Sequence, residues 1–337
     1  MQPSPRIGTL IALGLLAAGV ALAFSVGRFA VAPHELARAL WSLLSGRPSG
    51  LDAAVETVVV HVRGPRVLAA LAVGAALSVA GTAFQGLFRN PLVSPDILGA
   101  SAGAALGAVL GIYASLGVFG IQAAAFAGGL LAVSLVYAIG SAVRGADPVL
   151  SLLLTGIVVG GLLGAGIGLV KYLADPYNQL PAMTFWLLGS LAGTDASDLL
   201  PLLGPVLLGT AVLLLLRWKM NVMSLPDEEA RALGAPVALL RLLIVAAATL
   251  VTAASVAASG VVGWIGLVVP HLARFLVGPS FARLVPTAAL LGGAFLLFID
   301  TLARTLAPIE VPLGILTAVV GTPFFLWLLW RTQWSRA

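Results

Sequence analysis

Residues 150–172 read LSLLLTGIVVGGLLGAGIGLVKY, and this stretch decides the class of fold. It carries no charge before Lys171 and is long enough for an α-helix to cross a bilayer, which takes about 20 apolar residues. Apolar stretches of the same kind occur on both sides of it, separated by charged residues and by Pro or Gly. The sequence therefore predicts an all-α polytopic membrane protein with about ten transmembrane helices.

The predicted spans follow one another along the whole chain. They cover residues 7–27, 66–86, 96–115, 118–142, 150–172, 198–216, 238–258, 262–277, 284–305 and 313–331. The first is longer than the apolar core of a secretion signal, so we expect it to be retained as a membrane helix. Two short helices are expected outside the bilayer, at about residues 34–44 and 180–190. The whole chain, 1–337, is predicted to form a single transmembrane domain.

The composition supports the membrane assignment and excludes several other classes. Hydrophobic residues make up 60% of the 337 residues, charged residues only 9%, and the mean hydropathy is +1.08. A soluble domain carries about 25% charged residues, so this chain cannot cover a water-facing surface. The 18 Lys and Arg residues form no run, which argues against nucleic-acid binding. The absence of cysteine excludes disulfides and thiolate metal sites.

Chemistry-bearing motifs are scarce. Neither lysine lies in a G-x-x-x-x-G-K-[ST] loop, so the chain has no phosphate-binding loop of its own for ATP. The three histidines have no metal-ligand spacing, and no catalytic motif is found, so we expect no metal, no cofactor and no enzymatic activity. Asp300 and Arg304 form the one ionisable pair inside a predicted span, which is too little for the buried relay of a proton-coupled carrier. Transport by this chain would need energy from elsewhere.

Two ladders place glycine at every fourth residue of a predicted span. Such spacing keeps the glycines near one helix face and lets another backbone approach closely. For the first ladder we expect helix packing, whereas the second could equally pack or line a wide pathway. The ladders are Gly99, Gly103, Gly107 and Gly111, and Gly156, Gly160, Gly164 and Gly168.

The segment that joins the sixth and seventh spans is predicted to hold a short helix at the membrane surface. Pro226 and the acidic residues 227–229 suit the first turn of a helix, and Gly234 suits its end. Such a helix, at about residues 226–234, is either an ordinary interfacial helix or a coupling helix that docks into a partner ATPase.

Several stretches, taken in order, resemble the permease family of bacterial ABC importers for ferric siderophores, haem and cobalamin. The resemblance runs from the second span to the last and implies the fold of a type II importer permease. The matching stretches are Arg63–Arg66, Gly86–Leu92 with its continuation to Ala104, Phe185–Ser190, Asp227–Gly234, Gly263–Arg274, Asp300–Arg304 and Val311–Phe325.

The resemblance also implies roles for individual residues. Arg63, Arg66 and Arg304 match arginines of the outer face that meet acidic residues of a substrate-binding protein, and exposed cations would favour such docking. The alternatives are membrane anchoring and, for Arg304, a helical ion pair with Asp300. His271 lies in a motif general to the family, so we interpret it as structural.

The resemblance assigns an inner gate and a coupling helix as well. The residues matched to the coupling helix are Asp227, Glu228, Glu229, Arg231, Leu233 and Gly234. The gate is matched at Asn90, Pro91 and Leu92, with its second half expected near Val149 and Leu150 and a pathway along the second glycine ladder. At Val149 and Leu150 this chain is apolar where some family members carry small polar residues, which weakens that assignment.

The predicted function is the transmembrane subunit of an ATP-driven importer of an iron chelate, siderophore or haem. Cobalamin or an oxyanion such as molybdate are alternative cargoes, and an ion-coupled secondary carrier or a membrane enzyme or scaffold are alternatives of other classes. The resemblance implies a second permease copy, two ATP-binding subunits holding ATP and Mg, and an external binding protein. A bacterial or archaeal cytoplasmic membrane is expected, with both termini cytoplasmic, because that orientation places most Lys and Arg inside.

Overall fold

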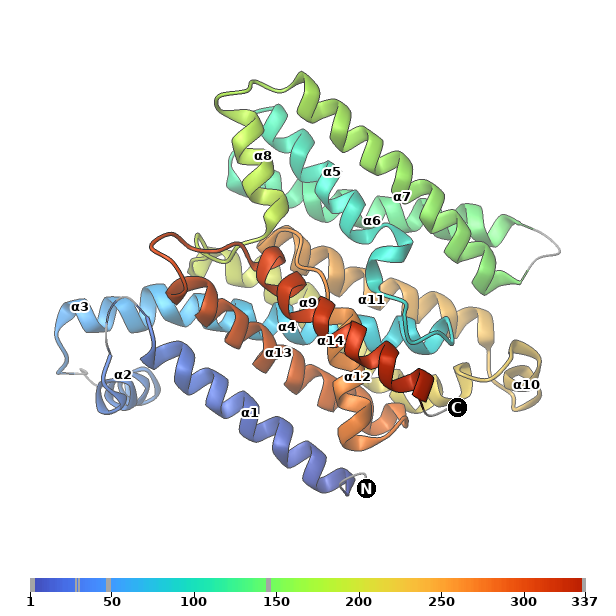
Figure 1. The fold of residues 1–337 in the computed structure, drawn as a ribbon, viewed down its shortest axis with the longest axis horizontal. Helices are drawn as coiled ribbons and strands as arrows, with labels where there is room; N and C mark the ends of the chain where they lie inside the picture. Colours follow the sequence, from blue (N-terminus) through green and yellow to red (C-terminus); the bar gives the residue numbers. More distant parts are fainter. Residues whose placement is uncertain (1–3, 28, 30, 47–49, 144–146, 335–337) are drawn as a thin grey trace.

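The computed structural model describes residues 4–27, 29, 31–46, 50–143 and 147–334, and over these ranges all regular structure is helical. Figure 1 shows the helices as a bundle in which α4 lies deep and α7 lies along one edge. In chain order the helices are α1 (Pro5–Ser25), α2 (Pro33–Ser45), α3 (Ala53–Glu56), the π-helix η1 (Thr57–Arg63), α4 (Gly64–Leu87), the 3-10 helix η2 (Pro95–Leu98), α5 (Ala100–Tyr113), α6 (Val118–Ala142), α7 (Pro148–Leu173), α8 (Gln179–Leu188), α9 (Ala196–Met223), α10 (Asp227–Ala232), α11 (Val237–Ser259), α12 (Ile265–Val277), α13 (Phe281–Thr305) and α14 (Leu313–Trp334).

The ten predicted spans are all found as helices. Seven helical stretches in the described ranges are long and apolar enough to cross a membrane, and the shorter apolar helices α5, α12 and α14 occupy the three remaining spans. The second span is longer than predicted, because α3, η1 and α4 form one continuous stretch from Ala53 to Leu87. His61 and Arg63 made its first part resemble a polar surface segment.

Helix α4 forms the centre of the bundle because glycines let other backbones touch it. A Cβ atom at Gly74 would lie 2.2 Å from the carbonyl oxygen of Gly292 in α13, and one at Gly81 would lie 2.0 Å from that of Gly266 in α12. Neither approach is possible for a residue with a side chain. Most side chains of α4 are therefore buried against its neighbours.

The first glycine ladder packs helix against helix, as predicted. A Cβ atom at Gly103 would lie 2.4 Å from the carbonyl oxygen of Gly128, and one at Gly107 would lie 2.1 Å from that of Ala124. Both partners are in α6, so α5 and α6 are in direct backbone contact. Gly99 instead terminates η2. Its φ of +80° lies in the left-handed region, which glycine adopts most easily.

Helix α9 begins at a capping box two residues before the predicted start of its span. The Asp195 side chain accepts hydrogen bonds from the amide and hydroxyl of Ser197, which together lower the pKa of this exposed carboxyl. The Asp198 side chain in turn accepts from the Asp195 amide at 3.0 Å. These bonds satisfy amides at the start of a helix that runs to Met223, immediately before the segment carrying α10.

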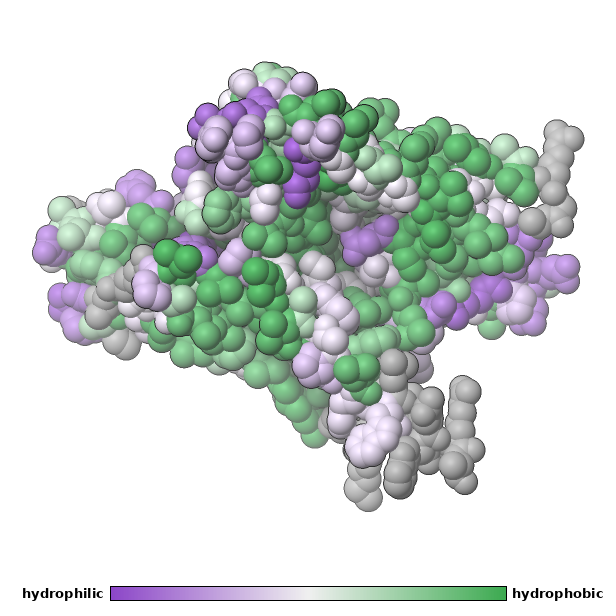
Figure 2. All heavy atoms as spheres, turned by 45° about the horizontal axis from the view of Figure 1, so that its top comes forward, coloured by the Kyte–Doolittle hydropathy of each residue, from purple (hydrophilic) through white to green (hydrophobic). Residues whose placement is uncertain are grey.

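The bundle has two polar ends, which we call the α10 face and the α8 face. The α10 face gathers the start of α1, the residues after α4, the start of α7 and helix α10, whereas the α8 face gathers α2, α8 and residues 306–312. In Figure 2 hydrophobic side chains cover most of the surface between hydrophilic ends, as expected of a membrane protein.

Candidate functional site

Helix α10 is found within the predicted segment 226–234. Pro226 precedes its first turn, three acidic residues occupy that turn, and Gly234 follows its end with a φ of +79°. Ala230 is fully buried and anchors the helix to the bundle. The helix is therefore a short, fixed projection on the α10 face.

The two sides of α10 face different surroundings. Glu228, Glu229, Arg231 and Leu233 are exposed, and Leu233 offers a large apolar side chain to solvent. Asp227 differs from its neighbours, since only 18% of its side chain is exposed and it faces the protein. Asp227 was predicted to contact an ATPase together with the other residues of α10, and that contact stays a prediction; the carboxylate is engaged by arginines of this chain.

Asp227 holds three arginines from three segments. One carboxylate oxygen accepts a hydrogen bond from Arg89 at 2.9 Å, and the other accepts one from Arg241 at 2.6 Å. Arg231 lies 3.6 Å away on the next turn of α10. The spacing of Asp227 and Arg231 is the one local signal for this cluster, whereas Arg89 lies 138 residues away along the chain and leaves none.

The predicted gate residues Asn90, Pro91 and Leu92 form a loop between α4 and η2 on the same face. The side-chain oxygen of Asn90 accepts a hydrogen bond from the Leu92 amide at 2.9 Å, which closes a tight turn. Pro91 and Leu92 are exposed. The loop directly follows Arg89, so it is tied to α10 through Asp227.

The second predicted half of the gate lies at the start of α7. The Asp147 carboxylate accepts hydrogen bonds from the amides of Val149 and Leu150, at 2.7 and 3.3 Å, and caps the helix. About two turns further along α7, a Cβ atom at Gly156 would lie 2.1 Å from the carbonyl oxygen of Ile97 in η2. The two predicted halves therefore belong to segments that pack against each other.

The second glycine ladder divides into a packed position and an open face. Gly156 is packed against η2, whereas a Cβ atom added at Gly160, Gly164 or Gly168 would meet no atom of the described chain within 4 Å. Helix α7 itself is among the least buried of the long helices. Gly160 and Gly168 lie eight residues apart, so these uncharged, open positions extend over about two turns of helix.

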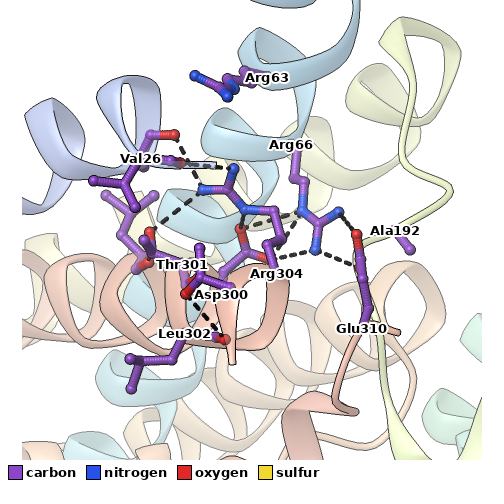
Figure 3. A network of polar contacts seen from close by, with 12 residues as sticks. Val26, Arg63, Arg66, Ala192, Asp300, Thr301, Leu302, Arg304 and Glu310 are labelled. Carbon is purple, nitrogen blue, oxygen red and sulfur yellow. Dashed lines mark hydrogen bonds and ion pairs between the residues drawn. The ribbon is translucent and has the colours of Figure 1, made fainter. Parts of the chain in front are cut away.

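A second charged cluster lies at the α8 face (Figure 3). The buried carboxylate of Asp300 in α13 pairs with Arg66 at 2.9 Å and with Arg304 at 3.2 Å. Arg66 also forms two hydrogen bonds with the carboxylate of Glu310, at 2.9 and 2.8 Å. The ion pair between Asp300 and Arg304, which the sequence offered as an alternative role for Arg304, is thus present as part of a larger network.

The predicted exposure of Arg63, Arg66 and Arg304 is wrong. Arg63 is 5% and Arg66 7% exposed, and the Arg304 side chain is 11% exposed. Arg63 donates hydrogen bonds to the carbonyl oxygens of Phe24 and Phe29, and Arg304 donates to that of Ala23 at 3.0 Å. These carbonyls lie at or just beyond the end of α1, where backbone acceptors lack helical partners. Arg63 and Arg304 therefore fasten the end of α1 to η1 and α13.

His271 makes a local contact that suits the structural role predicted for it. One ring nitrogen lies 3.0 Å from the carbonyl oxygen of Leu267, one turn earlier in α12. Nearby, Arg274 donates to the Gln85 side chain at 2.6 Å, and Gln85 donates to the Gly266 carbonyl at 3.3 Å. These polar groups join α12 to α4.

An all-helical membrane bundle with an open, uncharged helix face and a docked surface helix has the features of a transport permease. Residues 15–331 match the family model described as the FecCD transport family. The chain belongs to this family and is a multi-pass permease subunit of the ABC importer class, which confirms the resemblance.

Relatives and a solved structure agree over nearly the whole length. The chain is 40% identical to the hemin transport system permease protein HmuU of Yersinia pestis, covering 100% of this chain and 98% of that protein. It is 36% identical to the molybdate import system permease protein MolB of Haemophilus influenzae, covering 99% and 98%. A metal-chelate type ABC transporter in an inward-facing conformation matches with a TM-score of 0.87 at 35% identity, covering 97% of this chain and 99% of that one.

Proposed function

We propose that this permease imports an iron chelate, a siderophore complex or haem, across a bacterial or archaeal cytoplasmic membrane. It works as a homodimer with two ATP-binding subunits at the α10 face and receives its cargo from a binding protein at the α8 face. The α10 face and both termini lie in the cytoplasm. Binding and hydrolysis of ATP, with Mg, take place in the partner subunits.

The exposed side of α10 supports coupling to an ATPase. Glu228 and Glu229 are exposed beside the exposed Leu233, while the buried Ala230 packs the helix against the bundle. An apolar side chain beside charged ones, on a helix packed against the bundle, suits transmission of force from a bound partner. This fixed acidic helix is the observation that carries the proposal.

The open face of α7 supports a bulky cargo. Gly160, Gly164 and Gly168 leave a smooth surface without charge, along which a large chelate could pass without being held tightly. HmuU, similar over the full length, is named for hemin. Molybdate is the alternative that MolB raises, and cobalamin remains a further one.

The binding protein would dock at Arg66, where one of its acidic side chains replaces the carboxylate of Glu310. Glu310 is one of the two carboxylates on Arg66, and 32% of its side chain is exposed. An acidic side chain of the binding protein could take its place on Arg66 while the buried Asp300 stays paired. This mode of docking needs no exposed arginine.

Reconstitution in liposomes tests the proposal. With the ATP-binding subunits inside and the loaded binding protein outside, we expect uptake of labelled cargo that requires ATP and stops when the ATP-binding subunits are omitted. Uptake that continues without them would instead identify a secondary carrier. The compound that copurifies with the binding protein identifies the cargo, and a molybdate or cobalamin ligand would overturn the iron-chelate assignment.

A further inference from the structure

The carboxylate of Asp227 is a shared counter-ion for three arginines. Its two oxygens are engaged by Arg89 at 2.9 Å and by Arg241 at 2.6 Å, and Arg231 lies 3.6 Å away. One negative charge therefore serves three positive charges. Each pair depends on the position of the same carboxylate, so displacing Asp227 changes all three at once.

Arg241 is the most buried arginine of this cluster. It lies in α11, and only 8% of its side chain is exposed. Its Nε atom is buried and has no hydrogen-bond partner among the residues that the structure describes. A buried guanidinium in this state is strongly held by the one carboxylate it contacts. This contact links Asp227, and with it α10, to α11.

Arg89 connects the Asp227 cluster to the loop of Asn90–Leu92. Its backbone has a φ of +51°, a left-handed conformation that costs energy for a residue with a side chain and persists only where the surroundings impose it. The amides of Arg89 and Asn90 donate to carbonyl oxygens of Gly86 and Gln85, both at 3.2 Å. The strained residue thus connects the end of α4 directly to the loop of Asn90–Leu92.

We propose that Asp227 and Arg89 are positioning residues that transmit movement of α10 to the gate loop, with Arg241 as the anchor. A displaced α10 moves the Asp227 carboxylate, Arg89 follows it, and the turn closed by Asn90 and Leu92 changes its conformation. The inference rests on the proposed function, since it takes α10 as the contact of the ATPase. It adds a specific link between that contact and the gate, made of charge-assisted hydrogen bonds rather than apolar packing.

The absence of cysteine makes a direct test possible. Leu92→Cys introduces a single thiol in the gate loop, and its reaction rate with a water-soluble maleimide is measured in liposomes with the ATP-binding subunits, with and without a nonhydrolysable ATP analogue. In the otherwise unchanged chain, we expect the analogue to change the rate by roughly fivefold or more, the lower range of coupling between sites. Arg89→Gln and Asp227→Asn should each abolish this change, and Arg89→Lys should restore part of it.

A double-mutant cycle separates transmission from simple damage. Transport per ATP hydrolysed should fall in Arg89→Gln and in Asp227→Asn, and the double variant should be no worse than the more affected single variant. Arg283→Gln is the matched control, because Arg283 is an exposed arginine of the same face outside this cluster. Size-exclusion chromatography and the melting temperature in detergent show that each variant is folded.

The outcomes distinguish this inference from the function on which it rests. If Arg89→Gln and Asp227→Asn keep the response of the Leu92→Cys thiol, or if their effects on transport simply add, the inference is overturned while ATP-driven uptake stands. If no ATP-dependent uptake occurs with the unchanged chain, the proposed function itself fails. A response lost in the Arg283→Gln control as well would show general damage and would also overturn the inference.

Discussion

Asp300 and Asp227 show at the scale of single residues how a chain with few charges uses them. Each is a carboxylate of low exposure that pairs with more than one arginine, Asp300 at the α8 face and Asp227 at the α10 face. Buried charge is costly unless it is paired, so these sites are kept only where several segments must be held together. Asp300 holds α4 and α13, and through Arg304 the end of α1.

Removing the charge of Asp300 should destabilise the protein strongly. Asp300→Asn leaves Arg66 and Arg304 without their buried counter-ion, and we expect a loss of about 3–5 kcal/mol in the free energy of unfolding. Denaturant titration in detergent measures it. Glu310→Gln is the matched control, and since Glu310 is partly exposed we expect a loss below about 1 kcal/mol. Equal losses in the two variants would contradict the central role of Asp300.

The same Glu310→Gln variant should bind the binding protein more tightly. Removal of the internal carboxylate leaves Arg66 open to an acidic side chain of the partner, and we expect affinity to rise by roughly two- to tenfold at low salt. Surface plasmon resonance on permease in nanodiscs measures it. The gain should shrink at high salt, because the interaction is screened. Unchanged or weaker binding at low salt would argue against carboxylate exchange at Arg66.

At the scale of helices, close backbone contact is what organises the bundle. Gly107 of α5 touches the backbone of α6, whereas Gly168 of α7 has open space around it in the described chain. The same residue type at the same spacing thus builds an interface in one helix and a free surface in another. Which of the two occurs depends on the neighbour, not on the ladder itself.

Alanine at these two glycines should therefore have opposite effects on stability. Gly107→Ala places a Cβ atom 2.1 Å from the Ala124 carbonyl oxygen, and forcing α5 and α6 apart should cost about 1–3 kcal/mol. Gly168→Ala meets no such obstacle and should be neutral or stabilising by up to about 1 kcal/mol, since alanine favours helix. Melting temperatures in detergent report both. A stable Gly107→Ala protein would mean that the contact between α5 and α6 is looser than described.

The exposed charges of α10 lead to a prediction about the coupling of ATP hydrolysis to transport. Glu229→Lys reverses an exposed charge at the proposed ATPase contact, and we expect transport per ATP hydrolysed to fall by roughly tenfold or more because like charges across an interface are strongly unfavourable. Uptake and phosphate release from the same liposomes give this ratio. For Glu229→Gln, which only removes the charge, transport per ATP hydrolysed should lie between the values of the unchanged chain and of Glu229→Lys. Coupling that survives charge reversal would place the ATPase contact elsewhere.

Hydropathy predicts most elements well and fails where polar residues are buried by distant partners. The bounds of α6, residues 118–142, agree with the predicted span, because an apolar run ends where polar residues begin. The start of the second span was missed, since the buried Arg63 guanidinium donates hydrogen bonds to carbonyl groups of the distant residues Phe24 and Phe29. The contact of Asp227 with Arg89 was not predicted for the same reason. Partners so far apart along the chain leave no local pattern.

At the scale of the whole molecule, the two polar faces are joined by long helices with little charge between them. Helix α4 begins beside the Asp300 cluster and ends at Leu87, two residues before the Arg89 that pairs with Asp227, so one central helix connects both charged clusters. Helix α7 lies at the edge with its open glycine face. The tight packing around α4 and the open surface on α7 suit a transport pathway in which groups of helices move as rigid bodies.

The open face of α7 should be wetted by water if it lines the transport pathway. In the cysteine-free chain, Gly164→Cys places one thiol on this face, and a membrane-impermeant thiol reagent should react with it and block uptake. Leu131→Cys on α6 is the control, because Leu131 is 70% exposed within a predicted span and should face lipid.

We expect the thiol at position 164 to react roughly tenfold or more faster than the one at position 131, because a thiol reacts as the thiolate, which forms readily only in water. Reaction is followed by the mass of the labelled protein and compared with the loss of uptake. Similar slow rates at both positions would place the glycine face of α7 in lipid or against a second copy of the chain. In that case the pathway would have to be sought along another helix, and the smooth face would serve assembly instead.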